Sequence, residues 1–289
     1  MIDERIKQQL LVFQRNEITE HLIYLLLAAT ERSERNKDVL RRIAGDELRH
    51  YGIWRKITGQ EVPPDRFKVR RYQLLAKLLG VTFAIKLMES GEEGAQDAYG
   101  RIAAVVPEAA QVKREEEGHE KELIALIDEE RLQYIGSVVL GLNDALVELT
   151  GTLAGLTFAL QNAKLVGVAG LITGIAAALS MAASEYLSTK AEGGAKNPLR
   201  AAVYTGIAYV IAVTVLILPF LLLGNPYVSL LLALTGAIIV IFCFTYYYSV
   251  VRGGSFRRRF LEMVGVSLGV AGLSFLVGLL ARQLLGVNL

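Results

Sequence analysis

The most constraining feature of this sequence is a series of long apolar runs in its second half. Of 31 Lys and Arg residues and 29 Asp and Glu residues, only 9 and 5 respectively follow Tyr134. An α-helix needs roughly 20 apolar residues to cross a bilayer, and five runs are longer than this. They lie at about 136–160, 165–187, 201–223, 228–250 and 263–285. We therefore predict an all-α protein in which residues 135–289 form a five-helix transmembrane domain in a lipid bilayer.

The connections between these runs set the predicted orientation. Basic residues accumulate in cytosolic connections, and the first and third connections hold only Lys164. The amino terminus has no separate apolar block, so we expect no cleaved signal peptide. Residues 1–134 should then lie in the cytoplasm, beneath a multi-pass domain in the cell membrane. The second and fourth connections hold seven cations: Lys190, Lys196, Arg200, Arg252, Arg257, Arg258 and Arg259.

Residues 1–134 carry most of the charge, yet their apolar residues recur every three or four positions. This period is typical of amphipathic helices, and we expect Gly80 or Gly91 to interrupt the third of them. The predicted helices form a four-helix bundle and lie at about 3–31, 36–57, 66–104 and 108–132.

Two classes of site and one class of partner are excluded by composition. The single cysteine, Cys243, excludes disulfides within the chain and metal sites that use four cysteines. The net charge is only +2 and neither half is strongly basic, so we expect no nucleic-acid partner.

Two Glu-x-x-His pairs indicate a metal site in the first half. Glu47 and His50 lie in the second predicted helix, and Glu116 and His119 lie in the fourth. A spacing of three places both side chains of a pair on one helical face. A single pair is usually an exposed ion pair or a chance occurrence, but two pairs in alternate helices favour a shared site. Carboxylates and imidazoles together suit iron, manganese or zinc.

The other two helices supply further carboxylates. The first offers Glu17, with Glu20 as the alternative if Glu17 faces away, and the third offers Glu89 and Glu92. Every helix of the bundle would then contribute to a site for two metal ions. We expect the neighbouring acids Glu93, Glu115 and Glu117, and Glu20 if it is not a ligand, to be solvated or to support the ligands. His21 is expected at the edge of the core.

On these residues the first half, about 1–130, resembles the ferritin-like, rubrerythrin-type di-iron proteins. Their pattern is Glu, Glu-x-x-His, Glu-x-x-Glu and Glu-x-x-His in successive helices, and it matches Glu17, Glu47, His50, Glu89, Glu92, Glu116 and His119. The resemblance implies two bound irons and a reaction with oxygen or peroxide, such as ferroxidase activity. The cysteine-bound electron donor of many rubrerythrins is absent from the sequence. We assign no catalytic residue.

Acids inside the membrane runs are the second candidate site. The first run contains Asn143, Asp144 and Glu148, and the second contains Met181 and Glu185. A charged side chain at the centre of a bilayer costs about 2.5–3.5 kcal/mol, so such residues usually face a polar interior. Met181 and Glu185 share one helical face. The alternative is that these acids are structural and only form hydrogen bonds between helices.

The second half, about 135–289, resembles the vacuolar iron transporter family. The resemblance is carried by Asn143-Asp144 and by the run from Ser180 to Tyr186. It implies that Asp144 and Met181 line a metal path at a dimer interface and that Glu185 lies near its cytosolic mouth. Two usual glycines are replaced, by Ala145 and Ser184, and the family's Glu-rich insert after the second span is reduced to residues 188–200. Glu148 is an additional acid.

Proteins that join two such halves are known as membrane-bound ferritins, which the whole chain resembles. The resemblance implies a homodimer that exports ferrous iron, or manganese, by proton antiport, while the bundle captures or oxidises iron. The alternative, from another functional class, is a membrane-anchored di-iron oxidase or peroxidase with little or no transport.

Overall fold

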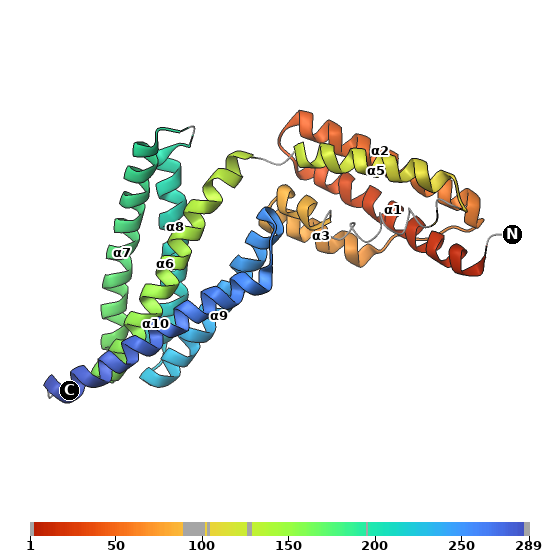
Figure 1. The fold of residues 1–289 in the computed structure, drawn as a ribbon. Coiled ribbons are helices and arrows are strands. Elements are labelled where there is room, and N and C mark those ends of the chain that lie inside the picture. Colours follow the sequence, from red (N-terminus) through yellow and green to blue (C-terminus); the bar gives the residue numbers. More distant parts are fainter. Residues whose placement is uncertain (1–2, 89–101, 103–104, 126–128, 195, 286–289) are drawn as a thin grey trace. The chain divides into compact units, whose positions relative to one another are not determined.

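The computed structural model describes residues 3–88, 102, 105–125, 129–194 and 196–285, which form two compact units, Met1–Asp128 and Glu129–Leu289 (Figure 1). All regular secondary structure in these described ranges is α-helical. The prediction of an all-α chain is therefore confirmed.

The first two helices of the amino-terminal unit lie within a few residues of their predicted limits, and the fourth begins at its predicted position. The third, predicted at 66–104, instead ends at Leu79. α1 spans Glu4–Thr30, α2 spans Glu34–Thr58, α3 spans Arg66–Leu79 and α5 spans Glu108–Ala125, with a further helical segment at 81–88. Gly80 ends α3 at a φ of 96°, a conformation that favours glycine. The predicted break at Gly80 is thus confirmed. Glu89, Gly91, Glu92 and Glu93 lie outside the described residues.

Local capping explains where α2 and α3 begin and end. The Ser33 side chain accepts a hydrogen bond from the backbone N–H of Asn36, and Gly59 ends α2 in the left-handed conformation at a φ of 68°. Asp65 caps α3 by accepting hydrogen bonds from the N–H groups of Phe67 and Lys68, both at 2.9 Å. These caps fix the limits of α2, which carries part of the polar site described below, and the start of α3.

The carboxy-terminal unit contains the five apolar helices. α6 spans Glu129–Leu160, α7 spans Ala163–Glu192, α8 spans Pro198–Leu222, α9 spans Pro226–Arg252 and α10 spans Phe256–Leu285. Each contains a segment long and apolar enough to cross a membrane, the first being Tyr134–Leu160. α8 and α9 both begin with an Asn cap followed by Pro, which needs no hydrogen-bond donor at that position. The prediction of five helices able to span a membrane is confirmed.

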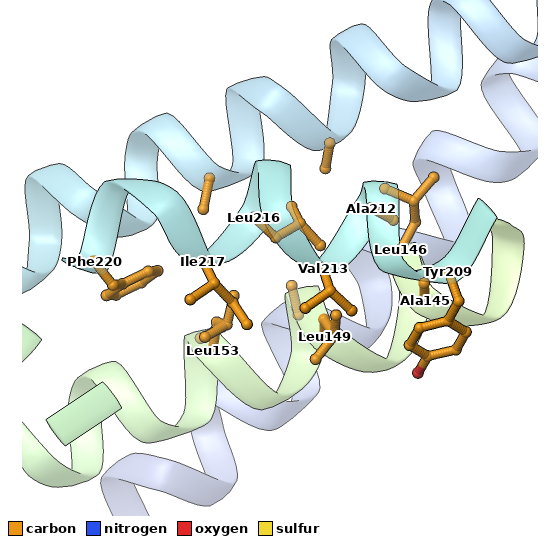
Figure 2. Close-up of a cluster of buried hydrophobic side chains, with 14 of the residues drawn as sticks. Ala145, Leu146, Leu149, Leu153, Tyr209, Ala212, Val213, Leu216, Ile217 and Phe220 are labelled. Carbon is orange, nitrogen blue, oxygen red and sulfur yellow. The ribbon is translucent and has the colours of Figure 1, made fainter. Parts of the chain in front are cut away.

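The core of this unit lies between α6 and α8 (Figure 2). Leu146, Leu149 and Leu153 of α6 pack with Val213 and Leu216 of α8, and all five are buried. This packing buries one side of α6 along most of its length. The opposite side of α6 carries Asp144 and Glu148.

Small residues let the membrane helices approach closely. A methyl group on Gly155 would lie 3.0 Å from the backbone oxygen of Ser274 in α10. A methyl group on Gly174 would lie 2.8 Å from the Val213 side chain in α8. These glycines are therefore required by the packing distance between helices.

Candidate metal sites

α1, α2 and α5 bring one group of acids and imidazoles together in the amino-terminal unit. Ligand atoms of Glu17, Glu47, His50 and Glu116 all lie within 4.8 Å of one another. Glu17, Glu47 and His50 are buried, and Glu116 is nearly so. This group can hold a metal ion, and four of the seven predicted ligands are in it.

His119 completes the cluster from the next turn of α5. Its Nδ1 atom lies 3.2 Å from Glu47 Oε1 and 3.6 Å from Glu116 Oε2. The Nδ1 atom of His50 likewise lies 3.0 Å from Glu116 Oε1 and 3.6 Å from Glu47 Oε2. The two imidazole rings stack with centroids 5.8 Å apart. Both histidines therefore turn the same ring nitrogen towards the shared carboxylates.

The inward-facing atoms of this cluster are close but poorly aligned for hydrogen bonding. Glu47 Oε2, His50 Nδ1, Glu116 Oε1 and His119 Nδ1 are buried, and none has a hydrogen-bond partner among the described residues. Buried polar atoms are rarely left this way, because each costs about 1–3 kcal/mol. A cation among them would satisfy all four. The residues therefore fit a metal ion.

In the metal-free cluster, the pKa of each ionisable group depends on the charges of its neighbours. Burial raises the pKa of Glu47 well above its ordinary value, and the Glu116 charge adds to this. Burial disfavours the charged forms of Glu116 and His119, but the hydrogen bonds and opposite charges around these side chains have a larger effect. They lower the pKa of Glu116 to about 2 and raise that of His119 to about 10. Protons thus supply positive charge that a metal ion would replace.

A second layer of carboxylates holds the outer nitrogen of each histidine. His50 Nε2 lies 2.6 Å from Glu115 Oε2, and His119 Nε2 lies 3.1 Å from Asp46 Oδ2. Each acid directly precedes the Glu of one Glu-x-x-His pair and binds the histidine of the other pair. If Nε2 donates its proton outward, Nδ1 can present a lone pair to a metal ion once that ion has replaced the Nδ1 proton.

Arg49 joins these two outer acids. Its guanidinium lies 2.6 Å from Asp46 Oδ1 and 3.1 Å from Glu115 Oε2. One side chain of α2 therefore braces the partners of both histidines. Neither Asp46 nor Arg49 was predicted to support the site, although an acid immediately precedes each Glu-x-x-His pair in the sequence.

The structure distinguishes Glu17 from Glu20. Glu17 belongs to the cluster, and the indole N–H of Trp54 donates to its Oε1 at 2.9 Å. Glu20 pairs with Lys68 at 2.9 Å, and burial raises its pKa to about 7. Nothing in the sequence identified Trp54 as a partner of Glu17. His21 contacts the Ala44 carbonyl oxygen through Nδ1 at 2.6 Å.

In the carboxy-terminal unit, the acids of α6 lie on the side that the chain does not cover. Asn143 and Glu148 are exposed and Asp144 is half-buried, in line with exposed Leu140. These residues share one side of the helix because they recur at helical spacing. The Tyr209 hydroxyl donates to Glu148 Oε2 at 2.8 Å, while Asp144 has no hydrogen bond or ion pair with a described residue.

Glu185 of α7 has several partners. The same carboxylate oxygen accepts hydrogen bonds from Ser137 of α6 at 2.6 Å and from Lys196 at 2.9 Å. Thr189 donates to it at 3.5 Å. Met181, one turn earlier, is half-buried and packs against the apolar core. Glu185 is thus held by an ion pair with Lys196, which was not predicted from the sequence.

Comparison with known proteins adds one finding. A family model described as the VIT family matches residues 135–194. This range covers α6 from Ile135 onwards, all of α7 and the start of the connection that follows. No curated protein and no solved structure matches the chain. The match and the five apolar helices together support a VIT-type membrane domain in a multi-pass membrane protein.

Proposed function

We propose that this chain forms a homodimer in the cell membrane and exports ferrous iron, or manganese, from the cytosol in exchange for protons. The amino-terminal unit is a cytosolic ferritin-like bundle that gathers the metal. Asp144, Met181 and Glu185 form the transport pathway. The ligands of the bundle are Glu17, Glu47, His50, Glu89, Glu92, Glu116 and His119.

The observation that carries this proposal is the uncovered acidic side of α6. Two acids and an amide there would face hydrocarbon if the chain were a monomer, at a cost of about 2.5–3.5 kcal/mol for each charge. A second copy placed against this side removes that cost by enclosing the acids. The VIT family match includes this helix, which supports metal transport as the purpose of the enclosure.

Asp144 is suited to bind a cation in transit. It has no hydrogen-bond or ion-pair partner among the described residues, so a divalent ion displaces only a proton or water there. A carboxylate in a low-dielectric environment can alternate between a proton and a cation. This alternation would couple export of the metal to entry of protons.

Ion flux in proteoliposomes tests the proposal. Asp144→Asn should abolish ferrous iron flux and Met181→Ala should reduce it. Glu262→Gln is the matched control, because this exposed acid of α10 pairs only with Arg258, at 2.9 Å, among the described residues. Parental flux in the Asp144 variant would refute the pathway.

The second candidate is a membrane-anchored di-iron oxidase, which the buried cluster of Glu17, Glu47, His50 and Glu116 favours. In that case two ferrous ions would give one electron each to dioxygen, which would take up two protons and leave as hydrogen peroxide. Rapid oxygen consumption on addition of ferrous iron, with no flux into vesicles, would support this function over transport.

A further inference from the structure

α3 has a second apolar side that points away from the core. Phe67, Leu74 and Leu78 are 77%, 56% and 69% exposed. Their spacings of seven and four place them on one side of the helix. Tyr72 and Ala76, which are buried, lie about half a turn away. Only one of the two apolar sides of α3 is therefore used for packing among the described residues.

The charges of α3 are all of one sign. The helix contains five basic residues and no acidic residue. Lys68 is engaged with Glu20, whereas the other four are exposed and form no ion pair with any acid in the described part of the chain. They flank the exposed apolar side and are Arg66, Arg70, Arg71 and Lys77.

An exposed apolar stripe between cations is the composition of a helix that lies in a membrane interface. Each Lys or Arg near an anionic lipid surface contributes about 1 kcal/mol. The amino-terminal unit ends at Asp128 and the first span begins at Tyr134, so α3 is tethered to a bilayer. Tethering raises the effective concentration, and a weak affinity is then sufficient.

We propose that α3 is an interfacial helix that docks the amino-terminal unit on an anionic bilayer surface through Phe67, Leu74 and Leu78. A second copy is the less suitable occupant, because contact between two α3 helices would bring their cations together without an acid to compensate them. Docking would keep the metal cluster at the membrane surface, and it does not depend on transport activity.

A spin label at position 78 of the full-length protein tests this docking. Cys243→Ala removes the natural cysteine, and Leu78→Cys provides the labelling site. The protein is placed in nanodiscs of phosphatidylcholine alone or mixed with phosphatidylglycerol. We expect the label in anionic discs to become several-fold more accessible to oxygen, which partitions into lipid, and several-fold less accessible to a water-soluble nickel chelate.

Two controls make the result specific. A label at Val12→Cys, an exposed position of α1, should stay accessible to nickel in both lipids. Combining Arg66→Gln, Arg70→Gln and Arg71→Gln should return the label at position 78 to water, with the helical circular dichroism signal unchanged.

Three outcomes would overturn the proposal. Full nickel accessibility at position 78 in both lipids would show that α3 faces water. Shielding from both reagents with spin–spin broadening would show that a second copy covers α3. Shielding from both without broadening would show that the carboxy-terminal unit covers it.

Discussion

The two polar clusters of this molecule differ in how completely one chain encloses them. In the amino-terminal unit, Glu17, Glu47 and His50 are buried among α1, α2 and α5, and a layer of acids and Arg49 supports the histidines. In the carboxy-terminal unit, Asp144 and Glu148 lie on an uncovered side of α6. A site that retains metal needs a rigid closed shell, whereas the proposed pathway needs access and a second copy to enclose its acids.

The histidines of the amino-terminal cluster should have the greatest effect on metal binding. Replacing both histidines, as His50→Ala with His119→Ala, should reduce metal bound to the purified protein by more than about tenfold, because two of the converging donors are removed. Elemental analysis measures this. Asp144→Asn, as the matched variant in the other unit, should retain parental metal content. Equal metal content in the histidine variant would exclude the cluster as the main binding site.

The uncovered side of α6 should contact a second copy of the chain. In a Cys243→Ala background, a single cysteine at Leu140, on the uncovered side of α6, should form a disulfide-linked dimer in membranes under mild oxidation. Leu276→Cys, on an exposed side of α10, serves as the control. Non-reducing gel electrophoresis measures the linkage. Preferential linkage through position 276 would place the dimer interface elsewhere.

Arg49 should have a smaller effect on metal affinity than the ligands themselves. Removing the residue that orients ligand-supporting groups typically costs about 10–100-fold in affinity, and we expect Arg49→Gln to fall at the lower end. Arg55→Gln is the control, since this exposed residue of the same helix pairs with Glu61 at 2.8 Å. Calorimetric titration with manganese measures both. Identical affinities would show that Arg49 does not position the histidines.

The smallest effect concerns Lys196, which forms an ion pair with Glu185. Lys196→Gln should lower the metal concentration needed for half-maximal flux by roughly fivefold, because an ion pair at a partly exposed position contributes up to about 1 kcal/mol. Lys190→Gln, in the same region but over the Tyr186 ring, should leave it unchanged. A higher half-maximal concentration in the Lys196 variant would mean that the lysine supports the pathway instead of competing with the metal.

Much of the helical architecture could be predicted because local rules determine it. Hydrophobic period and length located the five spans, and Gly80 was one of the two glycines expected to interrupt the third helix of the first half. The spacing of Glu47, His50, Glu116 and His119 predicted a shared cluster, since residues three apart on a helix project from the same face. Such predictions depend on one helix at a time.

Contacts between helices could not be predicted in the same way. The hydrogen bond from Trp54 to Glu17 depends on the rotation and depth of neighbouring helices. The same is true of the contacts that Asp46 and Glu115 each make with the histidine of the other helix. The pairing of Lys196 with Glu185 depends on the path of the connection after α7. Sequence spacing predicts which face of a helix a residue lies on, but the packing of helices determines which residues that face contacts.

The dependence of initial flux on metal concentration tests whether one unit gathers the metal and the other moves it. Proteoliposomes with the amino-terminal unit outside are supplied with increasing ferrous iron. Glu47→Gln should lower flux only at low concentration and reach the parental maximum, whereas Asp144→Asn should remain inactive at every concentration. Full activity of Asp144→Asn, or loss of the maximal rate in Glu47→Gln, would contradict this division of roles.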